Sequence, residues 1–295
     1  MQPSGAAGIV IRVASVAERS TTGADWGLPG PGSQTWRINR EGVLLLGGGR
    51  ALILQVAKPE VAAGVAEFSN YREDPWGRLY RTLDVTLKIV FGDEQTSRTA
   101  AEQLRRRHER VHGLDDRGEP YEALDPEHLM WVHATLIDSS LLIYDRYVQR
   151  LDDDDRHRYY EEMKSLGEAY GIPRDRQPAD YAAFRDYFDD MVAHGLRVTD
   201  TLRDVADSVM RPELPLVARP AAIPVRLVTV GYTPPALRDE LGLDWGPRRE
   251  RILEASTAAI RRLLPLLPGM FRYFPPARTA QRREAAPEAE VATSG

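Results

Sequence analysis

The chain has 295 residues, of which 42% are hydrophobic and 28% are charged, so it can bury a sizeable core. Its formal net charge of −5 argues against nucleic acid as a partner, because a phosphate-binding face needs a surplus of basic residues. The absence of cysteine excludes disulfides, iron–sulfur clusters, thiolate metal sites and cysteine nucleophiles.

No segment has the pattern of a signal peptide or a membrane span. The N-terminus lacks a basic start followed by a long apolar run. The longest apolar stretch, 42–56, contains four glycines and Arg50. We therefore expect a cytoplasmic protein without stable membrane insertion.

The two ends of the chain differ in composition from its middle. Residues 1–33 are rich in Gly, Ser, Thr and Pro, which predicts a flexible N-terminal arm. Residues 276–295 are rich in Ala, Arg, Glu and Pro, which predicts a disordered tail. Residues 34–275 are predicted to form one helical domain.

The first half of this domain shows the helical period. Helices are predicted over 37–46 and 50–57, and we interpret the three glycines between them as a tight bend or a close approach of helices. Pro59 suits the first turn of the next helix. The helix that starts at Asp74-Pro75 and stops at Gly92 carries one apolar stripe, formed by Leu79, Leu83, Leu87 and Val90.

The second half continues in the same way. A highly charged helix over 94–111 precedes a turn at 116–120, and Asp125-Pro126 caps a long apolar helix that should be central. Residues 219–235 are predicted to be a loop or an isolated extended segment, because one strand cannot form a sheet. The fold class is therefore all-α, with further helices at 152–170, 179–195, 199–210 and 248–264.

His108 and His112 form the first pattern with chemical meaning. They lie four residues apart with Glu109 beside the first, which matches the ligand spacing of a zinc site on one helix face. No obvious third ligand follows, and the alternative is that both rings are solvated on a very polar helix.

His133 lies in the most apolar helix, within Leu-Met-Trp-Val-His-Ala-Thr. It can be a core residue whose neutral ring is satisfied by one hydrogen bond, or it can be a ligand. The residue pattern leaves both interpretations open.

Arg78, Arg81 and Thr82 form the second pattern. Arg78 and Thr82 share a helix face, and Arg81 is adjacent to Thr82. In one interpretation Arg78 pairs with the acids at 73 and 74. In the other, the Arg78 guanidinium and the Thr82 hydroxyl point together into a pocket and bind an anion or a polar oxygen species. The acidic run 152–155 begins a helix, so we interpret it as a cap and not as a metal site.

Several segments, taken in order, carry a family resemblance: 46–52, 74–82, 91–92, 108–113, 121–126, 131–135, 159–161, 171–173 and 241–245. Through them, over about residues 35 to 275, the chain resembles the haem b oxygenases typified by latex-clearing protein (rubber oxygenase) and the MpaB oxygenase of mycophenolic acid biosynthesis. The resemblance implies a globin-like multi-helix core, with extra helices, that encloses a haem pocket.

The resemblance also implies roles for the residues singled out above. The family's proximal iron ligand maps onto His108, while Arg78, Arg81 and Thr82 would line the distal side and His133 would orient the ligand or a propionate. The implied activity is a haem-dependent oxygenase that uses dioxygen on a hydrophobic small molecule, with oxidative cleavage of an isoprenoid-like C=C bond as one form.

The chain departs from the family pattern at three positions. Arg81 stands where latex-clearing protein has a lysine that can cap the iron, and Lys58 and Phe68 stand near positions where relatives often carry histidine. These departures favour His108 and His133. The alternatives are a haem carrier or redox sensor without turnover, a helical bundle that has lost its cofactor, and a zinc hydrolase using His108 and His112.

Overall fold

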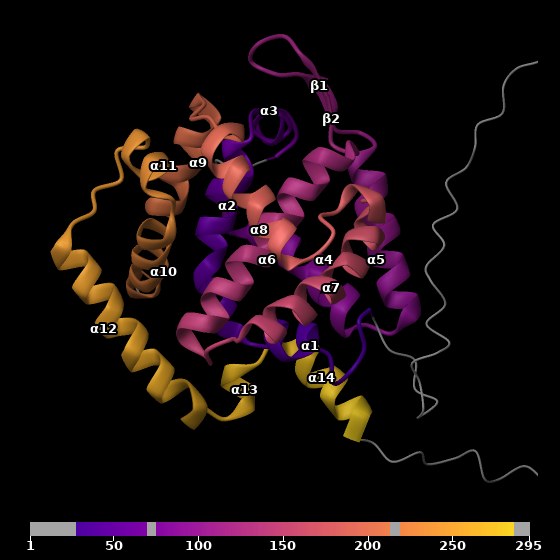
Figure 1. Ribbon diagram of the computed structural model, residues 1–295, viewed down its shortest axis with the longest axis vertical. Coiled ribbons are helices and arrows are strands. Elements are labelled where there is room, and N and C mark those ends of the chain that lie inside the picture. Colours follow the sequence, from indigo (N-terminus) through magenta and orange to yellow (C-terminus); the bar gives the residue numbers. More distant parts are fainter. Residues whose placement is uncertain (1–27, 70–74, 213–218, 286–295) are drawn as a thin grey trace, which may run out of the picture.

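The protein is described here by a computed structural model that covers residues 28–69, 75–212 and 219–285, without the side chains of 75–80 and 219–221. Helices dominate, which confirms the all-α prediction, and Figure 1 shows their arrangement. The globin-like form of the core stays a prediction. The α-helices are α1 (Gln34–Asn39), α2 (Gly48–Ala57), α3 (Pro59–Phe68), α4 (Pro75–Phe91), α5 (Glu94–His108), α6 (Pro126–Tyr147), α7 (Asp153–Tyr170), α8 (Tyr181–Asp190), α9 (Asp200–Met210), α10 (Arg219–Tyr232), α11 (Pro235–Glu240), α12 (Pro247–Leu263), α13 (Gly269–Arg272) and α14 (Pro275–Ala285).

Shorter elements connect these helices. Strands β1 (His112–Leu114) and β2 (Pro120–Glu122) pair antiparallel as a small hairpin that projects from the helices in Figure 1. Gly118 in its turn has a φ of 82°, a conformation that glycine adopts without strain. Three 3₁₀ turns and one π turn complete the described elements: η2 (Gly42–Gly47), η3 (Arg174–Arg176), η6 (Leu264–Leu266) and η4 (Met191–Gly195).

Helix α6 lies at the centre of the molecule, as predicted (Figure 1). The Asp125 carboxylate caps it by accepting from the Glu127 N–H at 2.8 Å, and Pro126 occupies its first turn. Trp131 is fully buried, and its indole N–H donates to the carbonyl oxygen of Leu54 in α2 at 2.8 Å. This bond joins the two most buried helices.

The glycine-rich segment at 47–49 allows helices to approach closely, which confirms its interpretation. A Cβ at Gly49 would overlap the hydroxyl of Thr229 in α10, and one at Gly47 would lie 2.8 Å from a side-chain carbon of Ile143. Arg50 follows and is buried, with its guanidinium 2.6 Å from the Asp138 carboxylate. The segment therefore brings α2 against both α6 and α10.

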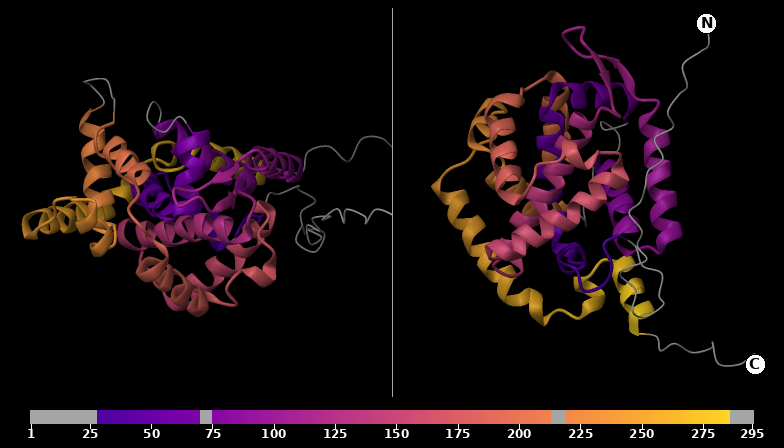
Figure 2. Two further views of the ribbon diagram at one scale, coloured as in Figure 1. Left: turned by 90° about the horizontal axis from the view of Figure 1, so that it is seen from above. Right: turned by 45° about the vertical axis from the view of Figure 1, so that its right-hand side comes forward.

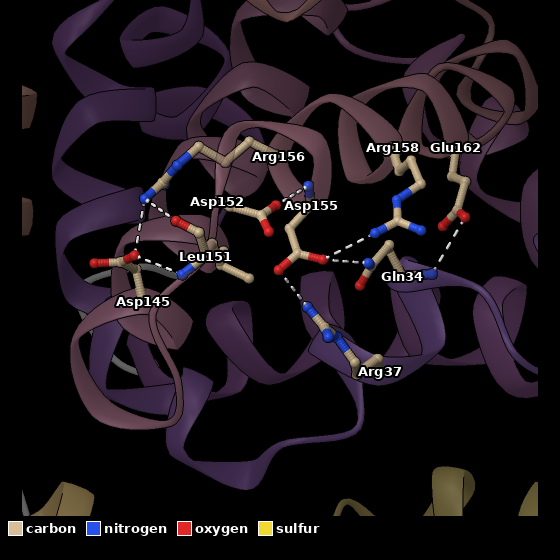
Figure 3. A network of polar contacts seen from close by, with 9 residues as sticks. All are labelled: Gln34, Arg37, Asp145, Leu151, Asp152, Asp155, Arg156, Arg158 and Glu162. Carbon is tan, nitrogen blue, oxygen red and sulfur yellow. Dashed lines mark hydrogen bonds and ion pairs between the residues drawn. The ribbon is translucent and has the colours of Figure 1, made fainter.

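The acidic run at the start of α7 is structural (Figure 3). The Asp152 carboxylate caps the helix by accepting from the Asp155 N–H at 2.7 Å. The Asp155 carboxylate accepts from the Gln34 amide at 2.6 Å and pairs with Arg37 at 3.1 Å. The predicted cap is thus confirmed, and Asp155 also ties α7 to α1.

Two predicted helices differ from those observed. The segment predicted as one helix over 37–46 is divided into α1 and η2, because the chain turns at Arg40. The helix predicted to reach Val111 stops at His108, where the Val111 N–H instead bonds to the His108 carbonyl oxygen at 2.9 Å. The chain then enters β1, so His108 and His112 do not share a helix face.

The segment 219–235 was wrongly predicted as loop or extended. It forms α10 from Arg219, with Pro224 inside the first two turns. Its β-branched residues suggested an extended chain, but Val228 and Thr229 pack into the interior beside α2. Tertiary packing therefore overrides local propensity here.

The predicted disordered tail is partly helical. Helix α14 covers Pro275–Ala285, and its small residues Ala277 and Ala280 are buried. The Arg283 guanidinium donates to the Phe91 carbonyl oxygen at 2.7 Å, which fixes α14 against the end of α4. Residues 286–295 of the predicted tail, and 1–27 of the predicted arm, lie outside the described residues. Within the described chain, no helix combines the length and the hydropathy needed to cross a bilayer.

Candidate functional site

A cavity of about 590 Å³ lies among α3, α4, α5 and α6. Its walls are largely apolar. Helix α6 contributes five side chains at helical spacing, and most of the others come from α3, α4 and α5. The apolar residues on these walls include Val61, Val65, Val85, Leu104, Leu129, Val132 and Leu136.

Four of the sequence-predicted site residues line this one cavity. Arg81 and Thr82 come from α4, His108 from the last turn of α5, and His133 from the middle of α6. These residues are up to 52 positions apart in the sequence, and helix packing brings them together. Arg78 belongs to α4, one turn before Thr82, but its side chain lies outside the described part of the structure.

The ring of His133 is buried and neutral. Its Nε2 lies 2.9 Å from the Met163 carbonyl oxygen, which can only accept, so Nε2 carries the proton and Nδ1 keeps a lone pair. Burial lowers the pKa of His133 to about 4, which keeps the ring uncharged at neutral pH. Nδ1 is buried and has no hydrogen-bond partner within the described residues.

Two polar cavity residues were not predicted from the sequence. The Tyr170 hydroxyl, at the end of α7, lies 3.1 Å from the Thr86 hydroxyl of α4, and burial raises the pKa of Tyr170 to about 12. Tyr170 also meets His133 edge-on, with ring centroids 5.3 Å apart. The i,i+4 spacing of Thr82 and Thr86 could have indicated Thr86, but nothing local in the sequence points to Tyr170.

Arg107 and His128 are further lining residues that the sequence did not single out. Arg107 adds a second arginine to the cavity beside Arg81. His128 holds the cavity rim to the hairpin, because its Nδ1 donates to the Glu122 carbonyl oxygen at 3.0 Å.

The structure does not support the zinc interpretation of His108 and His112. His112 is exposed on β1 and does not line the cavity, whereas His108 does. Over residues 28–69, 75–212 and 219–285, no three His, Cys, Asp or Glu side chains gather closely enough to hold a metal ion. The helix end at His108 is the physical reason, since it places His112 on β1 and not on the face of α5.

The fold and the cavity define an all-α protein with a largely apolar, histidine-lined site between packed helices. Residues 35–262 match the family described as ER-bound oxygenase mpaB/B'/Rubber oxygenase, catalytic domain, and the chain belongs to this family of oxygenases.

Two mycobacterial proteins are similar to most of the chain, and their names assign them no activity. The chain is 27% identical over 233 residues to the uncharacterized proteins Mb2261 of Mycobacterium bovis and Rv2237 of Mycobacterium tuberculosis. Each match covers 75% of this chain and 90% of the relative. No solved structure shows a significant match to the chain.

Proposed function

We propose that the chain is a haem b-dependent oxygenase that uses dioxygen to oxidise a hydrophobic small molecule. Cleavage of an isoprenoid-like C=C bond is the reaction that the family resemblance favours. The proposal rests on one observation: His108, His133, Arg81 and Thr82 line the same cavity, together with apolar side chains.

The residues present fit a haem. A cavity of about 590 Å³ lies in the size range of cofactor sites, and its apolar lining suits a porphyrin. Imidazole is a usual protein ligand of haem iron, and one such ligand is sufficient. The orphaned Nδ1 of buried His133 is a polar atom that a bound group would satisfy. Arg81 and Arg107 supply positive charge for carboxylate groups.

His108 is the proposed iron ligand, and His133 is the proposed orienting residue. Because the Nε2 proton of His133 is committed to Met163, its Nδ1 can accept a hydrogen bond but cannot donate one. A carboxylate has no proton to give, so this arrangement favours contact with a donor over contact with a propionate. His133 remains the alternative iron ligand through Nδ1, since ligating histidines commonly donate their other N–H to a carbonyl.

The remaining wall supplies charge and polarity. A guanidinium has no lone pair for a metal, so Arg81 acts as a positive charge where latex-clearing protein has a lysine. The Thr82 hydroxyl, and Arg78 one turn earlier on α4, are proposed to stabilise negative charge on oxygen. The apolar side chains of α3 and α6 hold the organic substrate and exclude water. Haem supplies the redox chemistry on dioxygen when it is bound.

The test combines metal content, an optical spectrum and oxygen uptake. Purified protein reconstituted with hemin should contain iron and not zinc, show a Soret band and unfold at a higher temperature than the apoprotein, since binding stabilises the folded state. The reduced holoprotein should then consume oxygen with an isoprenoid alkene, above the rate of free hemin. If the protein contains iron and shows a Soret band but consumes no oxygen in the presence of any alkene tried, it is a haem carrier or sensor, and the oxygenase proposal is overturned.

A further inference from the structure

Five exposed apolar side chains are gathered where α12 passes through η6 into α13. We call this set the apolar knuckle. Leu266 is 76% exposed and Phe271 is 71% exposed, and all residues between 265 and 271 are exposed. Clustered exposure of large apolar side chains marks an interaction site. The knuckle consists of Leu263, Leu266, Leu267, Met270 and Phe271.

The residues at both ends of the knuckle are fixed to the rest of the protein. Leu264 and Phe274 anchor it in the interior, and the Phe274 N–H donates to the Arg40 carbonyl oxygen at 2.9 Å. Arg272 forms two bonds of 2.7 and 2.8 Å with the fully buried carboxylate of Glu41. A buried bidentate ion pair therefore fixes the very turn that exposes Phe271.

The backbone of the knuckle is suited to an apolar medium. Pro265 and Pro268 have no N–H to satisfy. The N–H groups of Leu267 and Phe271 bond within the segment, to the carbonyl oxygens of Leu264 and Pro268 at 3.2 and 2.9 Å. These features reduce the number of backbone N–H groups in the knuckle that would need a hydrogen bond from water.

The segment that contains the knuckle carries charge of one sign, although one of its arginines, Arg272, pairs with Glu41 from another part of the chain. Residues 255–283 contain six arginines and no aspartate or glutamate, although the whole chain has a net charge of −5. Arg262 and Arg282 are exposed. The exposed apolar side chains of the knuckle therefore lie in a segment whose charged residues are all arginines.

We propose that the apolar knuckle and its arginines form a docking surface for an anionic lipid membrane, with Leu266 and Phe271 inserted at the boundary between headgroups and acyl chains. Apolar side chains flanked by arginine are the pattern of interfacial membrane binding. A two-fold dimer through this face would place one arginine-rich surface against its copy, which like-charge repulsion disfavours. Nucleic acid would leave the leucines and Phe271 without apolar partners.

The docking surface is separate from the cavity. Figure 1 shows α13 and α14 at the end of the molecule opposite the β1–β2 hairpin, and the cavity reaches that hairpin through Tyr121. Figure 2 again shows α12 on the periphery. The proposal is therefore independent of the cavity's function, and circular dichroism serves as the control for folding.

The test is co-sedimentation of the full chain with phosphatidylcholine vesicles that either contain or lack phosphatidylserine. We expect binding to the anionic vesicles only, weakened by high salt. Leu266→Ser combined with Phe271→Ser should reduce the partition coefficient about tenfold or more, and Arg262→Gln with Arg282→Gln should reduce it on anionic vesicles. The control is Leu114→Ser, which changes a leucine on β1 that is 65% exposed and should bind as the parent chain does.

Three outcomes would overturn the proposal. The first is equal binding to neutral and anionic vesicles. The second is unchanged binding of the double serine variant while its circular dichroism stays native. The third is a concentration-dependent dimer in light scattering that the same variant abolishes, because the knuckle would then bind a second copy of the chain.

Discussion

The Nε2–H of His133 donates to the carbonyl oxygen of Met163 at 2.9 Å, across the contact between α6 and α7. This bond fixes the tautomer of a fully buried ring on the cavity wall and leaves Nδ1 as an acceptor. The same burial makes the ring hard to protonate, so the stability of the fold should depend on pH through His133.

The sign of that dependence follows from the pKa of His133, which burial lowers from 6.5 to about 4. Between these values the unfolded chain binds a proton that the folded chain excludes, so the free energy of unfolding decreases as pH falls from 6.5 towards 4. The lowered pKa of His133 makes the free energy of unfolding about 3 kcal/mol larger above pH 6.5 than below pH 4. Urea unfolding of apoprotein at pH 7 and pH 5 measures it. His133→Gln keeps an N–H donor but cannot titrate, so it should lose about 2 kcal/mol less than the parent chain between these pH values. Equal losses in both proteins would contradict the assignment.

Gly49 should not tolerate a side chain. A Cβ there would overlap the Thr229 hydroxyl and press on Val209, so Gly49→Ala should lower the free energy of unfolding by about 1–3 kcal/mol. Gly246→Ala is the control for steric overlap, because no atom lies within 4 Å of a Cβ at that position, and the weaker N-cap of α12 should cost about 1 kcal/mol or less. Thermal unfolding of both variants provides the comparison, and a Gly49→Ala variant as stable as the control would show that α2 and α10 are not in close contact.

The hydroxyl pair of Tyr170 and Thr86 should contribute to stability as a unit. Tyr170→Phe and Thr86→Val each remove one partner of the 3.1 Å bond, and each should cost about 1 kcal/mol. The double variant should cost less than the sum of the two, because either single variant already loses the bond between the two hydroxyls, and Thr86→Val additionally loses only the 3.3 Å bond to the Thr82 carbonyl oxygen. A double-mutant cycle in urea measures the coupling, and additive losses would mean that the two hydroxyls do not interact.

Much of the fold can be predicted from local signals. Asp125-Pro126 marks the start of α6, and the glycines at 92 and 171 follow the ends of α4 and α7. These signals act within a few residues, through caps and φ preferences, so the sequence is sufficient to read them. The valines of 225–230 misled the prediction for α10, because its helix depends on packing against α2 and not on propensity.

The candidate site is predictable only in part. His108, His133, Arg81 and Thr82 were indicated by motif and family resemblance, and they line one cavity. Tyr170 and Arg107 could not be chosen among many similar residues, because only tertiary packing decides which ones face the cavity. His112 was misplaced because α5 ends one turn earlier than its charged sequence suggests.

The central claim of the proposed function is that the His108 imidazole would hold the iron of a bound haem. Its most direct test is a hemin titration, followed by absorption spectroscopy, of the parent chain, His108→Ala and His112→Ala. His112 lies four residues further along and is exposed outside the cavity, so its variant matches the chemistry of the change without touching the site. We predict a Soret band typical of imidazole-ligated haem in the parent chain and in His112→Ala, and its loss or displacement in His108→Ala. A Soret band in His108→Ala identical to that of the parent chain would contradict the claim.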